Sequence, residues 1–327
     1  MNLFSPLTVG DLTLANRVVM APLTRTRSGA EGVPGTLVAE HYAQRAGLGM
    51  IITEGVYPTA ESRAYPGQPG IVTDEQVAGW RAVADAVHAE GGVIVMQVMH
   101  GGRVSHTDIT GTPRIVAPSA IAIAGDVRTP LGKKPYPVPH ALTTDELAQV
   151  RDEIVAAAER AIEAGMDGVE VHGANGYLLH QFLSPASNQR TDAYGGSPEA
   201  RAKFVVEVTS AIADAVGARR VGIRLSPAHN IQDAFETDAD DVKATYEAVV
   251  AGLAPLGLAY LSVLHAEPAG DLVQALRGDF GGTFIANSGF GKLTTKDEAI
   301  DFVANGSADA VAVGRLAIAN PDLVERW

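Results

Sequence analysis

The chain has 327 residues, a formal net charge of −13 and no cysteine. The lack of cysteine excludes disulfides, iron–sulfur clusters, zinc–thiolate sites and a cysteine nucleophile. The acidic balance argues against nucleic acid, whose phosphates need a Lys/Arg surface. The first residues lack the basic region and apolar run of a signal peptide, and no apolar run approaches the ~20 residues that span a membrane. We therefore expect a cytoplasmic protein that binds neither nucleic acid nor membrane.

Eight short apolar runs, rich in β-branched residues, alternate with longer amphipathic segments. Runs that are apolar throughout are typical of parallel strands buried on both faces. The predicted strands cover residues 17–21, 49–54, 93–98, 168–171, 221–225, 260–263, 283–286 and 310–313.

Helix-start signals lie between these strands. A capping hydroxyl with Glu or Gln three residues on, or with proline directly after it, marks a helix N-terminus. Such signals stand at Thr73/Gln76, Thr143/Glu146, Ser197/Pro198 and Thr295/Glu298, and strong helix formers fill 148–164 and 239–253. Eight strand-then-helix units predict an α/β fold, a single (β/α)8 TIM barrel over residues 1–327.

One stretch departs from this pattern. Residues 101–142 contain no clear helix, and proline and glycine recur in them. We predict an excursion after the third strand that forms a partial lid subdomain over the barrel mouth.

Active sites of such barrels form at the carboxyl ends of the strands. Gly289 follows the seventh strand, and Gly314 and Arg315 follow the eighth. Backbone N–H groups and a guanidinium there match a phosphate site. Glycines in plain turns are the alternative.

Thr24, Gln97 and Arg224 form a second set of strand-end residues. A planar heterocycle with carbonyl and N–H edges needs such neutral and cationic groups, and Arg224 would stabilise negative charge on it. A salt bridge from Arg224 to Glu54 or Glu170 is an equally good interpretation.

His172, Asn175 and Tyr177 form a third set. In a first helical turn after the strand, His172 and Asn175 would point the same way and donate two hydrogen bonds to one substrate oxygen. Tyr177 could then supply a proton. A structural histidine and a core tyrosine remain the alternatives.

The remaining polar residues narrow the chemistry. None of the six lysines ends a predicted strand, so Schiff-base chemistry lacks its nucleophile. His100, His172 and His265 have few carboxylates near them at strand ends, so we predict no metal, and a metal-dependent barrel hydrolase is the weaker alternative.

Long motifs resemble those of the Old Yellow Enzyme family of FMN-dependent ene-reductases. The most specific is HGANGYLLHQFLSP at 172–185 with NQRTDAYGGS at 188–197; segments 16–25, 97–103 and 314–323 are similar too. A threonine at position 24, where another branch has cysteine, resembles the branch of the bacterial pentaerythritol tetranitrate and morphinone reductases.

The resemblance implies non-covalent FMN and reduction by NADPH or NADH, between which the sequence does not choose. FMN phosphate would be held by Gly289, Phe290, Gly314 and Arg315, and its ring by Pro22, Thr24, Gly55, Gln97 and Arg224. Substrate would contact His172, Asn175, Met99 and Tyr65. The substrates implied are α,β-unsaturated carbonyls and nitroalkenes, with nitrate esters as a further class; Tyr177 would donate the proton. Other FMN barrels fit less well: a dihydrouridine synthase would need a cysteine, and a dihydroorotate dehydrogenase a lysine near the flavin.

Two departures from the family stand out. Many relatives have tryptophan where Met99 stands, so we predict a wider or differently shaped substrate pocket. Relatives also continue for some tens of residues, whereas residues 320–327 only begin an eighth helix. We therefore expect a shortened eighth helix and C-terminal tail, with apolar surface along the first and eighth strands that a partner subunit or peptide covers.

Overall fold

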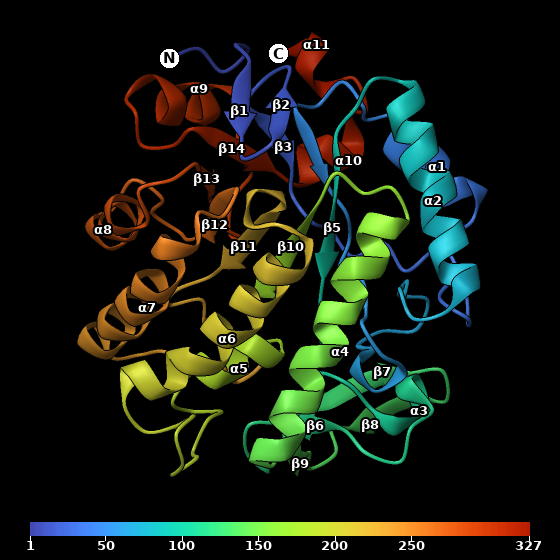
Figure 1. The fold of residues 1–327 in the computed structure, drawn as a ribbon, viewed down its shortest axis with the longest axis vertical. Coiled ribbons are helices and arrows are strands. Elements are labelled where there is room, and N and C mark those ends of the chain that lie inside the picture. The colour runs from blue at the N-terminus through green and yellow to red at the C-terminus, as the bar shows by residue number, and fades with distance from the viewer.

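The computed structural model describes residues 1–327, and eight parallel strands in it close into a barrel (Figure 1). In chain order these strands are β3 (Val18–Met20), β4 (Met50–Ile52), β5 (Ile94–Val98), β10 (Gly168–Gly173), β11 (Val221–Leu225), β12 (Tyr260–Leu264), β13 (Phe284–Asn287) and β14 (Ala310–Val313). The barrel closes where β14 pairs with β3. All eight predicted strands are therefore confirmed, and so is the predicted (β/α)8 architecture.

Helices lie outside the strands (Figure 1). The long ones are α1 (Thr36–Ala43), α2 (Asp74–Ala89), α4 (Thr144–Glu163), α6 (Pro198–Val216), α7 (Ala239–Leu253), α8 (Asp271–Phe280) and α9 (Lys296–Ala304). Shorter ones are α5 (Leu178–Leu183), α10 (Arg315–Ala319) and α11 (Leu323–Arg326). The predicted caps are confirmed: Thr73, Thr143, Ser197 and Thr295 each accept a hydrogen bond from the backbone N–H three residues on. None of the helices combines the length and apolarity needed to cross a membrane.

Alternation along the strands separates two apolar layers, because successive strand side chains point to opposite faces. One set of residues packs between strands and helices in a cluster of 63 buried residues. The other set fills the barrel interior in a cluster of 12, which includes Val19, Met50, Val95, Tyr260 and Ile285. The barrel is thus a packed core and not a pore.

The amino-terminal hairpin closes one end of this interior. β1 (Leu7–Val9) and β2 (Leu12–Leu14) pair antiparallel, and the fully buried Val9 and Leu14 join the interior cluster. The site must therefore lie at the other end, where the strands have their carboxyl termini.

The excursion after β5 lies at that other end, far from the hairpin in Figure 1. It holds more structure than the sequence predicted: a four-residue helix α3 (Thr107–Thr110) and two small sheets. One sheet pairs β6 (Val116–Ala117) with β9 (His140–Ala141), and the other pairs β7 (Asp126–Thr129) with β8 (Gly132–Pro135). Strands of two to four residues are too short to give a periodic signal. The lid role of the excursion stays a prediction.

The apolar surface expected along the first and eighth strands is not there, so that expectation was wrong. Every residue of β3 and β14 is buried. Arg45, from the loop after α1, holds the segment after β14 in place. It donates hydrogen bonds to the carbonyl oxygens of Ala317 and Ile318 at 2.9 and 2.7 Å. The segment after β14 is therefore hydrogen-bonded to the loop after the first helix.

Candidate active site

On four strands, β5, β10, β12 and β13, the inward-facing positions near the barrel mouth are polar. Gln97 lies two residues after the interior Val95 on β5, and Ser262 lies two residues after the interior Tyr260 on β12. The same period places Glu170 and His172 on β10 and Asn287 at the end of β13. The sequence of the strands thus builds a polar layer on top of an apolar one.

Glu170 is the buried anion of this layer. Its Oε1 accepts from Gln97 Nε2 at 2.7 Å, and its Oε2 accepts from the Tyr260 hydroxyl at 3.1 Å. Complete burial raises the pKa of Glu170, while the Arg224 charge and the two hydrogen bonds oppose that rise. These bonds fix the Gln97 amide with its oxygen free to face the mouth.

Arg224 is the buried cation. It is 2% exposed, and its Nη2 donates to Asn287 Oδ1 at 3.1 Å and its Nη1 to Ser262 Oγ at 3.4 Å. Burial lowers the pKa of Arg224, and the Glu170 carboxylate counteracts this. Its hydrogen bonds go to neutral side chains, and Glu54 instead accepts from the backbone N–H groups of Arg25 and Thr26. The guanidinium therefore keeps donors for a ligand.

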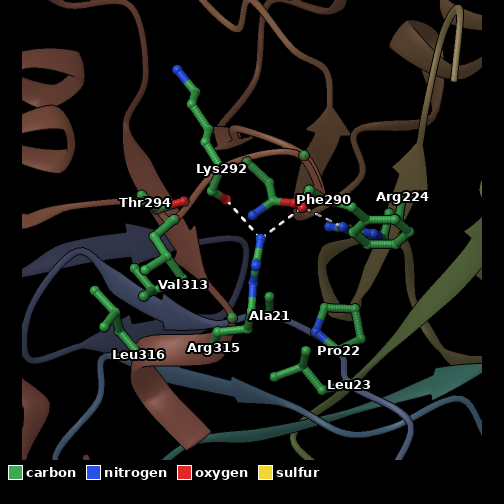
Figure 2. A pocket seen from close by; sticks show the side chains of 14 residues that line it. Ala21, Pro22, Leu23, Arg224, Phe290, Lys292, Thr294, Val313, Arg315 and Leu316 are labelled. Carbon is green, nitrogen blue, oxygen red and sulfur yellow. Dashed lines mark hydrogen bonds between the residues drawn. The ribbon is translucent and has the colours of Figure 1, made fainter. Parts of the chain in front are cut away.

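A cavity of about 250 Å³ opens between the ends of β13 and β14. Arg315 reaches across it, as Figure 2 shows, and Nη2 donates to the carbonyl oxygens of Phe290 and Lys292 at 2.6 and 3.0 Å. Gly289 adopts a φ of +85°, which glycine accepts without strain. All four residues predicted to hold a phosphate line this cavity: Gly289, Phe290, Gly314 and Arg315.

A second cavity, of about 240 Å³, adjoins the first and shares four lining residues with it, Pro22, Leu23, Arg224 and Phe290. The residues predicted to contact the flavin ring and the substrate all line this second cavity: Pro22, Thr24, Gly55, Tyr65, Gln97, Met99, His172, Asn175, Tyr177 and Arg224. The structure thus brings together every predicted site residue, although these come from all parts of the chain.

His172 and Asn175 face this second cavity by a different route from the one predicted. Asn175 lies in a left-handed turn with φ +58°, and helix α5 starts only at Leu178, so the expected helical turn was wrong. Asn and Asp are the non-glycine residues that best tolerate this conformation. The Asn175 Nδ2 is buried without a hydrogen-bond partner. An unpaired buried donor that lines a cavity points to a ligand acceptor.

The His172 ring is neutral with its proton on Nε2. Nδ1 accepts the backbone N–H of Ala174 at 3.3 Å, so it carries no proton. Complete burial, with the Arg224 charge nearby, holds the pKa of His172 well below 6.5. His172 therefore offers an N–H donor to the cavity across the physiological pH range.

Tyr177 and Tyr65 form a phenol pair whose hydroxyl oxygens are 2.7 Å apart. Burial raises the pKa of Tyr177, while hydrogen bonds from Tyr65 and Gln232 to its oxygen oppose the rise. Burial and the contact with Tyr177 raise the pKa of Tyr65 further. Tyr177 is therefore a protonated acid whose oxygen lies within hydrogen-bonding distance of the Tyr65 hydroxyl.

One site residue, Gln232, gave no usable sequence signal. Gln232 lines the second cavity and donates from Nε2 to the carbonyl oxygen of Asn175 at 2.9 Å, but it lies in a loop between predicted elements. Ser226 Oγ accepts the Asn175 N–H at 2.8 Å. Ser226 and Asn287, by contrast, each directly follow a predicted strand and could have been found by the strand-end criterion.

The two alternative chemistries would require either a cluster of metal ligands or a lysine at a strand end. His, Asp and Glu side chains nowhere gather in threes in a way that could hold a metal ion. No lysine ends a barrel strand; Lys292 lines the first cavity from a loop, with Nζ 2.7 Å from Glu298.

The residues present fit FMN. One cavity offers a guanidinium and glycine-rich backbone, as a phosphate requires, and the adjoining one offers the Gln97 amide, Thr24 and the buried Arg224 for a polar ring. A family model described as NADH:flavin oxidoreductase / NADH oxidase matches residues 2–327. The chain belongs to this flavin oxidoreductase family. The predicted FMN cofactor, nicotinamide reductant and oxidoreductase class are thereby confirmed.

Relatives in this family are similar over nearly the whole chain. A probable flavin mononucleotide-dependent alkene reductase of Leishmania infantum is 42% identical and covers 99% of this chain, which spans 89% of that protein. The 12-oxophytodienoate reductase 7 of Oryza sativa subsp. japonica is 39% identical, with 99% and 87% covered.

Solved structures agree with these relatives. An old yellow enzyme homologue from Zymomonas mobilis superposes with a TM-score of 0.93 at 36% identity, covering 100% of this chain and 92% of that one. Morphinone reductase in complex with tetrahydroNAD superposes with a TM-score of 0.92 at 42% identity, with 100% and 90% covered. The resemblance to the Old Yellow Enzyme family is confirmed.

Proposed function

We propose that this flavin oxidoreductase reduces the C=C bond of activated alkenes, namely α,β-unsaturated carbonyl compounds and nitroalkenes, with NADPH or NADH as the electron source. The observation that carries the proposal is the second cavity. It holds two N–H donors, from His172 and Asn175, and the acid Tyr177, beside the ring-binding set of Thr24, Gln97 and Arg224.

FMN supplies hydride chemistry when bound, because the flavin accepts a hydride from the nicotinamide coenzyme and passes it on. The residues that would hold its phosphate are Gly289, Phe290, Gly314 and Arg315, and those that would hold its ring are Pro22, Thr24, Gly55, Gln97 and Arg224. The buried cation Arg224 would stabilise negative charge on that ring, since a charge acts strongly where water is excluded.

His172 and Asn175 would bind the carbonyl or nitro oxygen of the alkene. Both offer an N–H group that needs no reorganisation, His172 through its fixed Nε2–H and Asn175 through its unpaired Nδ2. Two preset donors stabilise the negative charge that grows on this oxygen when hydride reaches the β-carbon.

Tyr177 would protonate the α-carbon. The Tyr65 hydroxyl lies 2.7 Å from the Tyr177 oxygen, and by donating to it would leave the O–H of Tyr177 to point at the substrate. The same hydroxyl would stabilise the phenolate that remains after transfer. Tyr65 would thus act through Tyr177, in addition to the substrate contact predicted for it.

Anaerobic turnover tests this function. Purified protein reconstituted with FMN should oxidise NADPH or NADH in step with the conversion of 2-cyclohexenone to cyclohexanone, identified by gas chromatography. Coenzyme oxidation that requires dioxygen and forms no cyclohexanone would overturn the proposal.

We further propose that nitrate esters are a substrate class and that the protein is located in the cytoplasm. Residues 101–142 would form a lid on a single barrel domain over 1–327, and a partner subunit or peptide would bind at the C-terminal region. Limited proteolysis of the protein with and without a bound enone tests the lid, since closure would protect the excursion.

A further inference from the structure

A buried histidine–carboxylate pair lies behind the substrate cavity and takes no part in the proposed chemistry. His180 on α5 is fully buried, and Glu236 is 5% exposed. His180 Nε2 is 3.1 Å from Glu236 Oε1. Burying a polar pair costs free energy unless each group is hydrogen-bonded. The hydrogen-bond partners of His180 and Glu236 therefore identify the segments that the pair connects.

The histidine holds the turn that carries Asn175 and Tyr177. His180 Nδ1 accepts the backbone N–H of Gly176 at 2.7 Å. Gly176 has φ +80° and Asn175 has φ +58°, so this turn lies in the left-handed region at both residues. An accepting Nδ1 carries no proton, so the ring donates through Nε2 to Glu236.

The carboxylate holds a second strained loop. Glu236 Oε2 accepts the backbone N–H of Ala228 at 2.8 Å, and Ala228 is itself left-handed with φ +56°. Its Oε1 also accepts from the buried hydroxyl of Tyr246 at 3.0 Å. The loop that Glu236 holds carries Gln232, which also has a positive φ of 55°.

The two turns meet at the substrate cavity. Gln232 donates to the Asn175 carbonyl oxygen, and a Cβ on Gly176 would lie only 2.9 Å from the Gln232 Cβ. Left-handed non-glycine residues persist only where surrounding contacts determine them, and they concentrate at functional sites.

We propose that His180 and Glu236 are positioning residues, a latch between the 174–177 turn and the 226–237 loop that sets the direction of Asn175 Nδ2 and Tyr177 O–H. The role in catalysis rests on the proposed function, whereas the latch itself does not. Neither residue lines the cavity, so both act through the residues that do.

Amide hydrogen exchange of the FMN holoenzyme tests the latch itself. His180→Leu removes the acceptor of the Gly176 N–H, so exchange in a peptide covering 174–178 should quicken at least about tenfold, since a lost hydrogen bond opens the amide locally. Thr245→Val is the matched control. It deletes a buried hydroxyl bonded to Arg201 and lies next to Tyr246 on α7, outside the latch. Equal exchange in wild type and His180→Leu would overturn the latch.

Reoxidation of the reduced enzyme tests the positioning role. His180→Leu should slow reoxidation by 2-cyclohexenone at least about tenfold and leave reoxidation by dioxygen within about twofold, because dioxygen uses neither donor. In a double variant that carries Tyr177→Phe and Asn175→Ala, His180→Leu should slow reoxidation by 2-cyclohexenone less than about threefold further. The effects of residues that act through one another are not additive. An equal loss in both backgrounds would show a purely structural residue and overturn the role.

Glu236→Gln keeps the test decisive if His180→Leu does not fold. It preserves size and can still accept from His180, but it cannot also accept the Ala228 N–H, so the enone rate should fall while the dioxygen rate holds. An unchanged enone rate would contradict the proposal. A wild-type protein that no alkene reoxidises would instead defeat the proposed function, and the exchange result would still stand.

Discussion

The two cavities at the barrel mouth are built in different ways. The buried polar groups of the flavin side, Gln97 on β5, Arg224 on β11 and Asn287 on β13, project from strands. On the substrate side His172 also projects from a strand, β10, whereas Asn175 and Gln232 lie in turns that meet at the cavity. Four of the five non-glycine residues with positive φ lie in those turns: Asn175, Ala228, Gln232 and Asp233. Strand side chains are aimed by the period of the strand, whereas turn side chains are aimed by hydrogen bonds from distant segments.

The difference implies that substrate-side substitutions should damage alkene reduction and spare flavin chemistry. Tyr177→Phe should slow enone-dependent reoxidation by about 10²- to 10⁴-fold, the usual contribution of a general acid. Stopped-flow absorbance of the flavin measures this, with reduction by NADPH and reoxidation by dioxygen as controls. Equal losses in the rate of reduction by NADPH and in the rate of reoxidation by the enone would contradict the distinction between the flavin side and the substrate side.

A flavin-side substitution should do the reverse. Arg315→Met removes the guanidinium of the first cavity, and hydrogen bonds to a charged group contribute about 1.5–3 kcal/mol. FMN should therefore bind roughly tenfold to a hundredfold more weakly, as flavin fluorescence titration would show. Lys292→Met is the matched control: that lysine lines the same cavity but is paired with Glu298, so its loss should matter less. A larger loss of FMN affinity in Lys292→Met than in Arg315→Met would show that Lys292, and not Arg315, is the main cation for the phosphate.

Tyr65→Phe should slow enone reduction less than Tyr177→Phe does. It deletes the hydroxyl that lies 2.7 Å from the Tyr177 oxygen, which should slow enone reduction by up to about tenfold. Because that hydrogen bond lowers the pKa of Tyr177, its loss should raise the pKa further. The enone rate needs the protonated phenol, so its decline at alkaline pH should move to higher pH. A shift to lower pH would contradict the direction of this hydrogen bond.

Met99→Trp should have the smallest effect. Met99 lines the substrate cavity and packs with Tyr177 and Ile123 of the excursion. If methionine leaves a wider pocket, the substitution should reduce kcat/KM for bulky β-substituted enones several-fold relative to 2-cyclohexenone. Unchanged ratios would show that the pocket is no wider than in relatives with tryptophan.

What the sequence predicted and what it missed follow the same division. All eight strands and their polar carboxyl ends were predicted, because burial on both faces leaves a continuous apolar run and the period of two then aims Gln97 and Arg224. His172 and Asn175 were found by their motif, but their predicted helical turn was wrong, since the left-handed turn depends on His180, Ser226 and Gln232. Those contacts span 4 to 57 residues, and no local pattern encodes them.

The most direct test of this division follows two hydrogen atoms into the product. The coenzyme should supply hydride through the flavin side, and Tyr177, whose proton exchanges with water, should supply the other atom. With NADPH deuterated at C4 in ordinary water, the reduced enone should carry deuterium on its β-carbon only. With unlabelled NADPH in deuterium oxide it should carry deuterium on its α-carbon only, once exchange of the product with solvent is corrected for. Solvent deuterium on the β-carbon, or coenzyme deuterium on the α-carbon, would contradict the assignment of the two sides.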